Sequence, residues 1–244
     1  MQITYIGHSG FMAECDDCTF IFDYYEGLIP AVNKGKPLFV FVSHSHPDHF
    51  NPEIFSIQGP KEIHYILAHE IRSHMKPFLS LENLHFMRGE EQLMLKAATS
   101  EAAFSVQTLR STDCGVAFLI CYRGKYIYHA GDLHWWVWRG ESRQYNNNMT
   151  ANFKKYTEPL KGLNLFAAFV PLDPRQEDWY DKGMLHILET ACVNYAFPMH
   201  FWKDYSVINR FLSSPQGEKY KKHIIQIERE GQTFVCNENQ EVEV

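Results

Sequence analysis

The chain has 244 residues, of which 45% are hydrophobic, and its formal net charge is -6. A chain of this length can bury a sizeable core, and no Pro/Gly/Ser-rich linker, low-complexity tract or internal repeat divides it. A single domain over residues 1–244 is therefore predicted. Its acidic balance and scattered Lys and Arg argue against a nucleic-acid partner, because polyanions are bound mainly through clustered positive charge.

The N-terminal residues 2–6 have the pattern of a strand, not of a basic region followed by a long apolar stretch, so neither export nor membrane insertion is expected. Six cysteines in a chain without an export signal are expected to be reduced thiols. Cys15 and Cys18 flank two aspartates, and since no second CxxC pair exists, a hairpin turn is predicted there and not a zinc site. These features predict a cytoplasmic protein. The oligomeric state stays open, and a homo-oligomer is compatible with the sequence.

Short apolar runs bounded by turn residues predict many strands and fewer helices. Strands are expected at 3–6, 10–14, 19–22, 38–42, 63–67, 92–95, 104–109, 116–122, 125–129, 165–170 and 195–199, with a closing hairpin of 224–229 and 232–236. Helices are expected at 52–58, 70–76, 149–161, 182–195 and 206–212. Sheets and amphipathic helices each need a covered face, so the predicted fold class is α/β (α+β), a four-layer αββα sandwich with two sheets face to face.

The most informative motif is His44-Ser45-His46-Pro47-Asp48-His49, which directly follows the apolar run at 38–42. That run is typical of a strand buried on both faces, and Pro47 prevents its continuation into a helix. The polar side chains therefore lie on a tight loop at a strand end. Imidazole and carboxylate groups clustered in this way favour metal binding, and alternate residues of an extended loop can face two different ions.

The loop resembles that of the metallo-β-lactamase-fold hydrolases, which has the form His-x-His-x-Asp-His after an apolar strand. Further family motifs follow in the expected order: Ile6-Gly7-His8-Ser9-Gly10-Phe11, Ile21-Phe22-Asp23, His129-Ala130-Gly131-Asp132 and Pro198-Met199-His200-Phe201-Trp202. The resemblance spans almost the whole chain and is greatest to the branch that includes L-ascorbate-6-phosphate lactonase. It implies the αββα fold and a metal-dependent hydrolase.

The resemblance also implies a ligand set for two metal ions. The first ion would be held by His44 and His46, the second by Asp48, His49 and His200, and Asp132 would bridge them. Two Zn²⁺ ions are the expected cofactors, with Mn²⁺ or Fe²⁺ as alternatives.

One ligand expected from the resemblance is missing. The family usually supplies a third histidine to the first metal from the segment before a mid-chain glycine, and residues 109–115 contain no histidine. Asp113 is the favoured substitute because a carboxylate oxygen is a competent ligand, and it would shift the metal preference toward Mn²⁺ or Fe²⁺. Cys114 is a second candidate. A turn-capping role for Asp113 remains the alternative.

Other polar and aromatic residues suggest a substrate site. His134 lies two residues beyond Asp132 and is followed by Trp135-Trp136-Val137-Trp138, an aromatic cluster that could wall a pocket or simply pack. Arg175 follows a predicted strand and is a candidate for gripping an anionic group. His8 and His129 are expected to support the site or to pack, and His64 and His85 to lie at the surface.

The leading functional hypothesis is a hydrolase that uses a metal-bound hydroxide, oriented by Asp48, on a small ester, lactone, amide or phosphoester. This hypothesis predicts a small-molecule substrate as the partner. A non-catalytic metal or ligand sensor is the alternative from another class, because the third histidine is missing. A redox di-iron enzyme is disfavoured, since members of that type typically replace the second histidine of the loop by Glu and this chain has His46. A nucleic-acid-processing phosphodiesterase is disfavoured by the acidic charge and the lack of a clamp-sized insertion.

Overall fold

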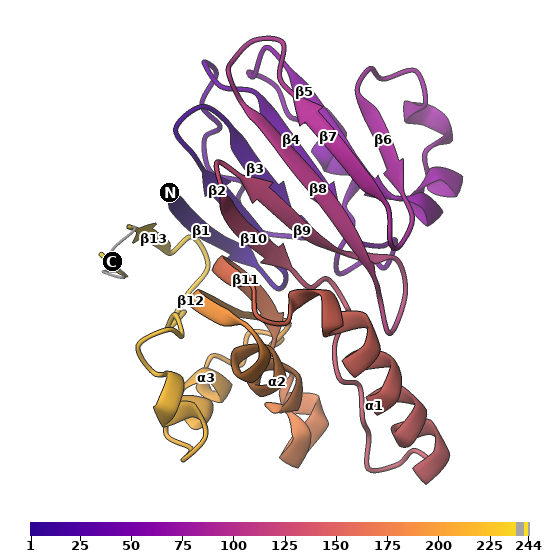
Figure 1. The fold of residues 1–244 in the computed structure, drawn as a ribbon. Coiled ribbons are helices and arrows are strands. Elements are labelled where there is room, and N and C mark those ends of the chain that lie inside the picture. The colour runs from indigo at the N-terminus through magenta and orange to yellow at the C-terminus, as the bar shows by residue number, and fades with distance from the viewer. Residues whose placement is uncertain (238–241, 244) are drawn as a thin grey trace.

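The computed structural model describes residues 1–237 and the backbone of residues 242–243, which form two facing sheets with helical segments around them (Figure 1). The first sheet has eight strands, in the order β14-β13-β1-β2-β3-β4-β5-β6. They are β1 (Gln2–Gly7), β2 (Gly10–Glu14), β3 (Thr19–Phe22), β4 (Leu38–Val42), β5 (Ile63–Ala68), β6 (Leu84–Met87), β13 (Thr233–Cys236) and β14 (Val242–Glu243).

The second sheet has six strands, in the order β12-β11-β10-β9-β8-β7. They are β7 (Gln92–Lys96), β8 (Ala103–Arg110), β9 (Val116–Tyr122), β10 (Lys125–His129), β11 (Asn164–Pro171) and β12 (Cys192–Met199). Strands β3 to β6 run parallel in the first sheet, and β10 to β12 run parallel in the second. Loops that follow parallel strands leave the same edge of a sheet, which is where α/β proteins gather functional side chains.

Three α-helices are described, α1 (Arg143–Thr157), α2 (Lys182–Thr190) and α3 (Ser206–Leu212), and α2 packs on β11 and β12. Six short 3₁₀ helices complete the helical segments: η1 (Pro52–Ser56), η2 (His69–His74), η3 (Lys76–Phe78), η4 (Glu158–Leu160), η5 (Pro174–Trp179) and η6 (Gly217–Tyr220). The predicted α/β class with two facing sheets and helices outside is confirmed.

Phenylalanines from both sheets fill the core between them. Phe22 of β3 lies 5.5 Å from Phe169 of β11, and Phe41 of β4 lies 5.2 Å from Phe118 of β9, measured between ring centroids. Phe39 of β4 meets Phe104 of β8 edge to face at 4.7 Å. Such pairs bury large apolar surfaces and also prefer particular ring orientations. They therefore favour one relative position of the two sheets.

Several predicted elements differ in the structure. The predicted helices at 52–58 and 70–76 are the short 3₁₀ helices η1 and η2, and the predicted helix from residue 182 ends at Thr190, after which β12 begins at Cys192. The backbone of Ala191 is extended (φ -120°, ψ 155°), so it cannot continue the helix.

The predicted hairpin of 224–229 with 232–236 is wrong, because β13 pairs with β1 and with β14, whereas Ile224 forms only an isolated bridge to Ala196. Strand β6 was not predicted, and its pairing with β5 is parallel.

His64 was expected at the surface but is buried, with 7% of its surface exposed. Its Nε2 lies 2.7 Å from Glu62 Oε1 and its Nδ1 lies 3.2 Å from His85 Nε2. The ring also stacks on Phe39 at 4.9 Å. A polar residue inside a strand can thus be part of the core when its ring nitrogens have partners.

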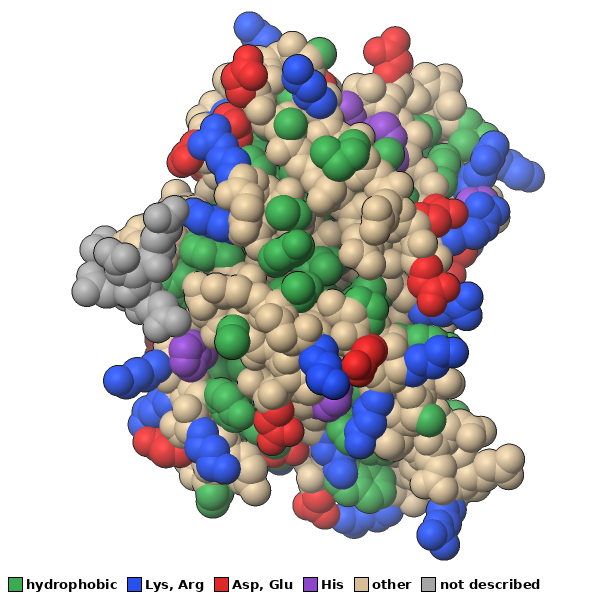
Figure 2. Space-filling view, in the orientation of Figure 1, with side chains coloured by type: hydrophobic (Ala, Val, Ile, Leu, Met, Phe, Trp, Pro, Cys, Tyr) green, Lys and Arg blue, Asp and Glu red, His purple; other side chains and the backbone are tan. Residues whose placement is uncertain are grey.

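Charged side chains of both signs are interspersed on the face of the molecule shown in Figure 2. Among the described residues, no helix combines the length and the apolar character that crossing a bilayer requires.

Candidate metal centre

Polar side chains gather where the parallel strands of both sheets end. In the first sheet Asp23 follows β3 and His44 follows β4, and in the second Asp132 and His200 follow β10 and β12. His44 and His200 are almost completely buried, as is Asp132. The two sheets therefore bring together side chains that lie more than 150 residues apart in the sequence.

Asp132 lies at the middle of this group, and its two carboxylate oxygens face different partners. Oδ1 is 3.2 Å from His49 Nε2 and 3.4 Å from His200 Nε2, whereas Oδ2 is 3.5 Å from His44 Nε2. A carboxylate placed in this way can contribute one oxygen to each of two ions. This is the geometry expected of a bridging ligand.

On the Oδ1 side of Asp132 lies a cluster that we call the second site, made of His8, Asp48, His49 and His200. One ligand atom from each of these residues lies within 4.8 Å of the others. Asp48 Oδ2 is 3.4 Å from His8 Nε2 and 3.8 Å from His200 Nε2. His8 is thus a fourth donor beside the three residues assigned to this ion from sequence.

On the Oδ2 side lies the first site, made of His44, His46, Asp113 and Asp132, again with one ligand atom of each within 4.8 Å of the rest. Asp113 comes from the turn between β8 and β9, and its Oδ2 is 3.6 Å from His46 Nδ1. The turn that lacks the expected histidine therefore places an aspartate beside the first site. Cys114 is not part of either cluster.

Five buried atoms in this region have no hydrogen-bond partner. They are the Nε2 atoms of His8, His44, His49 and His200 and the Oδ1 atom of Asp132. Leaving one buried polar atom unsatisfied costs about 1–3 kcal/mol, so five such atoms converging on two points are expected only where a ligand completes them. Four imidazole nitrogens and a carboxylate oxygen are a donor set that divalent zinc, iron or manganese accepts, so the residues fit the metal that the sequence predicted.

The opposite ring nitrogens of these histidines are held by other side chains. Asp23 Oδ2 lies 2.7 Å from His49 Nδ1, and Ser43 Oγ lies 2.9 Å from His44 Nδ1. Asp173 Oδ2 lies 2.9 Å from His200 Nδ1. Partners of this kind fix the ring orientation and direct Nε2 toward a metal. Metal-binding histidines in general have such a hydrogen-bond partner on their other ring nitrogen.

Electrostatic effects favour a neutral His44 and ionised Asp48 and Asp132, which are the forms that bind metals. His49 differs: burial would lower its pKa, but the carboxylates of Asp132 and Asp23 raise it to about 10, so a metal would have to displace its proton. Burial lowers the pKa of His44 to about 4, which keeps its imidazole neutral at pH 7. Burial alone would raise the pKa of Asp132, but the charges of His49 and His200 hold it well below the usual range. Burial also opposes ionisation of Asp48, yet the 3.4 Å contact with His8 and the charges of His49 and His200 lower its pKa. Both carboxylates are therefore ionised at neutral pH.

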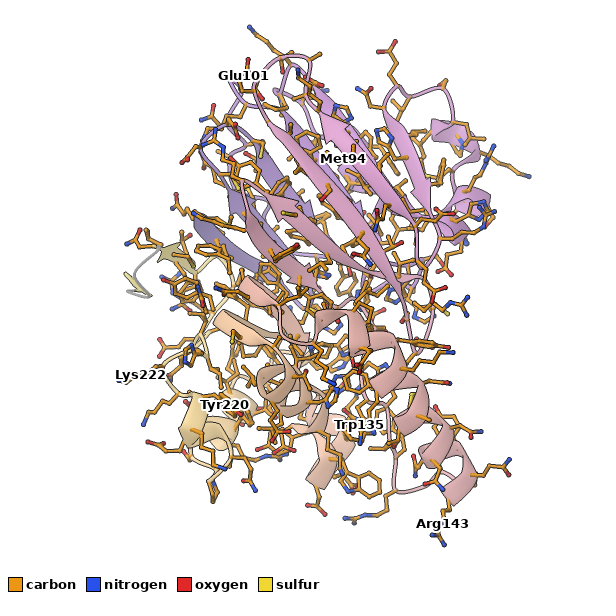
Figure 3. All side chains as sticks on the ribbon, viewed as in Figure 1. Met94, Glu101, Trp135, Arg143, Tyr220 and Lys222 are labelled. Atoms are coloured by element: carbon orange, nitrogen blue, oxygen red, sulfur yellow. The ribbon has the colours of Figure 1, made fainter. Side chains whose placement is uncertain are left out.

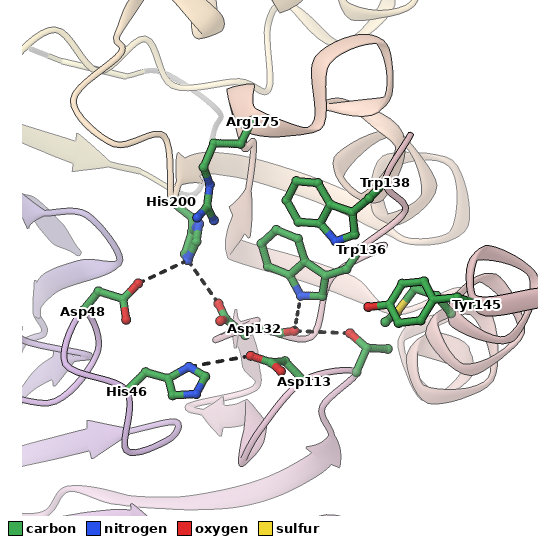
Figure 4. Close-up of a pocket in the computed structure, with 11 residues that line it drawn as sticks. His46, Asp48, Asp113, Asp132, Trp136, Trp138, Tyr145, Arg175 and His200 are labelled. Carbon is green, nitrogen blue, oxygen red and sulfur yellow. Dashed lines mark hydrogen bonds and ion pairs between the residues drawn. The ribbon is translucent and has the colours of Figure 1, made fainter. Parts of the chain in front are cut away.

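A cavity of about 260 Å³ opens directly onto the candidate centre (Figure 4). One side is formed by candidate ligands, and the other by aromatic and apolar side chains with one arginine. Its lining comprises His46, Asp48, Thr112, Asp113, Asp132, Trp136, Trp138, Tyr145, Met149, Arg175 and His200.

Two of the three residues predicted to bind substrate do not line this cavity. His134 is completely buried, and its Nε2 is bonded to Gln176 Oε1 at 2.7 Å. Trp135 lies beside α1 and α2 (Figure 3), where its ring stacks on Phe153 of α1 at 5.5 Å. The next members of the same aromatic cluster, Trp136 and Trp138, line the cavity instead, together with the predicted Arg175.

His8 is the residue of the second site whose position the sequence did not reveal. It occupies the turn between β1 and β2, and its backbone oxygen accepts a hydrogen bond from His200 N at 3.2 Å. Both histidines have positive φ angles, 51° for His8 and 61° for His200, a conformation that is uncommon for non-glycine residues. The Gly7-His8-Ser9-Gly10 sequence was the available signal, because the flanking glycines favour a tight turn.

Comparisons with known proteins agree with this arrangement of strands. Igni18, a metallo hydrolase from Ignicoccus hospitalis, is 16% identical, with a TM-score of 0.60 over 95% of this chain and 96% of that one. YhfI, a metallo-β-lactamase-fold protein from Bacillus subtilis, is 12% identical, with a TM-score of 0.59 over 95% and 98%. A protein from Veillonella parvula described as "a possible metal-dependent hydrolase" is 13% identical, with a TM-score of 0.59 over 97% and 99%. At these identities the likeness concerns the fold.

No curated protein sequence matches the chain. The family model described as "Beta-lactamase superfamily domain" matches residues 2–137, more than half of the chain, and this segment contains the loop 44–49, Asp113 and Asp132. By this match and by its two-sheet fold, the chain belongs to the β-lactamase superfamily domain family.

Proposed function

We propose that this protein is a metal-dependent hydrolase with two divalent ions, acting on a small ester, lactone, amide or phosphoester. The observation that supports this most strongly is that four buried imidazole nitrogens without hydrogen-bond partners lie around the Asp132 carboxylate, next to an open cavity. The fold shared with metallo hydrolases is consistent with the proposal.

Bound ions would polarise the substrate oxygen and lower the pKa of water, which is the chemistry that hydrolysis at neutral pH needs. In the proposed reaction the water oxygen bonds to the carbonyl carbon or phosphorus, the bond to the leaving oxygen or nitrogen breaks, and one proton moves to the leaving atom. Asp48 lies at the cavity wall as an ionised carboxylate, so it can orient the water by accepting a hydrogen bond from it.

Each ion would have a distinct set of donors. His44, His46 and Asp113 would hold the first ion and His8, Asp48, His49 and His200 the second, with Asp132 shared. Zn²⁺ suits the imidazoles, while the carboxylates of the first site also suit Mn²⁺ or Fe²⁺.

Metal analysis combined with variants tests the proposal. The purified wild-type protein is expected to bind about two equivalents of metal and to hydrolyse generic esters or phosphodiesters. Asp132→Ala is expected to abolish both properties while circular dichroism shows an unchanged fold, whereas Asp178→Ala, at an exposed position, changes neither. A single tightly bound ion and no turnover in the wild type would contradict the hydrolase and favour a sensor. Unchanged metal content in Asp132→Ala would overturn the ligand assignment.

A further inference from the structure

Arg175 is distinctive because it is the one Lys or Arg among the described residues that line the cavity. Its Nε and Nη2 atoms donate hydrogen bonds to both oxygens of Asp173, at 2.5–3.0 Å. The guanidinium also lies over the ring of Trp202 at 4.6 Å. These contacts hold the arginine in one orientation, and none of the described hydrogen bonds uses its Nη1 atom.

Arg175 is adjacent to the candidate centre. Asp173 Oδ2 accepts a hydrogen bond from Arg175 Nη2 and also bonds His200 Nδ1 at 2.9 Å, so the guanidinium and a second-site imidazole share one oxygen. Figure 4 shows the Arg175 side chain pointing toward His200. Arg175 and the second site are therefore close enough for one small molecule to contact both.

The wall next to Arg175 is aromatic. The rings of Trp136 and Trp138 are stacked, with 5.8 Å between their centroids and an angle of 5° between their planes. Trp136 Nε1 donates to the backbone oxygen of Asp132 at 3.0 Å, and the backbone of Trp138 exchanges two hydrogen bonds with the side chain of Asn146 in α1. The wall is therefore fixed before a ligand arrives, which lowers the entropic cost of binding a flat ring.

The cavity size limits the ligand. A volume of about 260 Å³ is just below the ~300–1,000 Å³ of ordinary small-molecule pockets, so the part of a ligand inside the cavity has about the size of one substituted ring. The carboxylates of Asp48, Asp113 and Asp132 would repel an anion in the metal-free protein, while bound cations would reverse that field.

We propose that the substrate is a small molecule with one flat ring and one anionic group, a carboxylate or phosphate that accepts hydrogen bonds from Arg175. The ring packs against Trp136 and Trp138, and the scissile ester, amide or phosphoester bond lies beside Asp132. This inference rests on the proposed hydrolase function and specifies its substrate class.

Binding of simple probes to the metal-loaded protein, measured by calorimetry, tests the inference. Benzoate is expected to bind at least about tenfold more tightly than neutral benzamide and than acetate, which lacks the ring. Arg175→Lys keeps the positive charge but loses the forked geometry, and it is expected to weaken benzoate binding by about tenfold or more. Arg139→Gln is the control. It removes an exposed arginine from the loop between β10 and α1, where Arg139 pairs with Glu177 and Asp178, and it is expected to leave benzoate binding unchanged.

Equal benzoate affinity in wild type and Arg175→Lys would overturn the role of Arg175, because the metals alone would then bind the anion. Equal affinity of the wild type for benzoate and acetate would overturn the role of the ring, and this comparison needs no variant. Phenylphosphonate in place of benzoate distinguishes a phosphate-bearing from a carboxylate-bearing substrate.

Failure of this inference is distinguishable from failure of the hydrolase proposal. If the wild type binds two metals and hydrolyses the neutral ester phenyl acetate, but the benzoate comparisons fail, only the substrate class is wrong. If benzoate binds through Arg175 but no neutral or anionic aryl ester is hydrolysed, the anion site is supported and the hydrolase function is wrong.

Discussion

At the scale of single residues, the centre is organised around the two oxygens of Asp132, which separate two groups of donors. The groups differ in exposure: His8, His49 and His200 of the second site are nearly inaccessible, whereas the side chains of His46 and Asp113 of the first site are each 44% exposed. Ligands that are already buried and oriented lose little entropy on binding. We therefore expect the second site to bind metal more tightly than the first.

Asp113 is expected to be the decisive ligand of the first site, in place of the missing histidine. Asp113→Ala should lower the bound metal from about two equivalents to about one, because His44 and His46 then share only one carboxylate, that of Asp132. Metal analysis after dialysis measures this, and Cys114→Ser is the matched control from the same turn, expected to retain both equivalents. If Asp113→Ala still binds two equivalents of metal, Asp113 is not a metal ligand and serves only to cap the turn.

His8 is expected to strengthen the second site, either by direct ligation or by holding Asp48 through the 3.4 Å contact between His8 Nε2 and Asp48 Oδ2. Loss of such a partner typically costs 10–100-fold in metal affinity. His8→Ala should therefore raise the dissociation constant of one ion by at least about tenfold, measured by competition with a chelator. His74→Ala, an exposed histidine of η2, is the control. If His8→Ala binds both ions with wild-type affinity, His8 has only a packing role.

At the scale of elements, Glu62 joins the start of β5 to the loop that follows β7 in the other sheet. Its carboxylate accepts hydrogen bonds from the backbone nitrogens of Ala98 and Thr99 and from Thr99 Oγ1, and it contacts His64 Nε2. Burial alone would raise its pKa, but the bonds from His64 and from Ala98 lower it to about 2. The ionised carboxylate is thus a link between the two sheets at the end far from the metal centre.

Glu62→Gln is expected to lower the free energy of unfolding at pH 7 by about 1–3 kcal/mol, since hydrogen bonds to a charged acceptor are lost. A carboxyl with a lowered pKa in the folded state stabilises the protein above its unfolded value of about 4.5 and loses this effect as the pH falls toward 2. The difference between variant and wild type should therefore shrink over that interval, as followed by urea unfolding. Exposed Glu82→Gln should show no such difference, and a pH-independent loss in Glu62→Gln would contradict the ionic mechanism.

At the scale of the whole molecule, the two sheets come into direct backbone contact at Ser43, the residue between β4 and the loop 44–49. The backbone oxygen of Ser43 accepts a hydrogen bond from Val116 N of β9 at 2.9 Å. A Cβ atom on Gly115 would lie 1.9 Å from that oxygen, and one on Gly131 would lie 2.6 Å from the Cβ of Ser43. Only glycine allows this approach, which brings His44 from one sheet to Asp132 from the other.

Gly115→Ala is expected to destabilise the protein by about 2 kcal/mol or more beyond Gly124→Ala, because overpacking displaces one sheet from the other. The two glycines form a matched pair, since their φ angles are +67° and +77° and a Cβ on Gly124 would meet nothing within 4 Å. Urea unfolding of both variants isolates the steric effect from the backbone strain. Equal stability of the two would show that the sheets can separate without cost.

Much of the fold could be predicted because its signals are local. Strands such as β3, β4 and β9 have the predicted bounds, since each is a compact run of aromatic and β-branched residues between turn residues. Strand β6 lacks such a run, and its pairing with β5 depends on partners 19 residues away in the sequence, as in Tyr65 with Leu84. The N-terminal half of α1 is rich in asparagine and was missed, although Ser142 caps it by accepting a hydrogen bond from Tyr145 N.

The sequence by itself determined that a buried strand ends in a loop of imidazoles and carboxylates, because donor chemistry and strand periodicity are properties of neighbouring residues. The family resemblance also pointed to Asp113, Asp132 and His200 as partners of that loop, but their distances from one another were decided only by the tertiary structure. It brought His8 and Asp113 to the two sides of Asp132, and it placed Trp136 and Trp138, not His134 and Trp135, on the cavity. These choices depend on how two sheets pack across a shared core, and no local pattern encodes the distance between residues on different sheets.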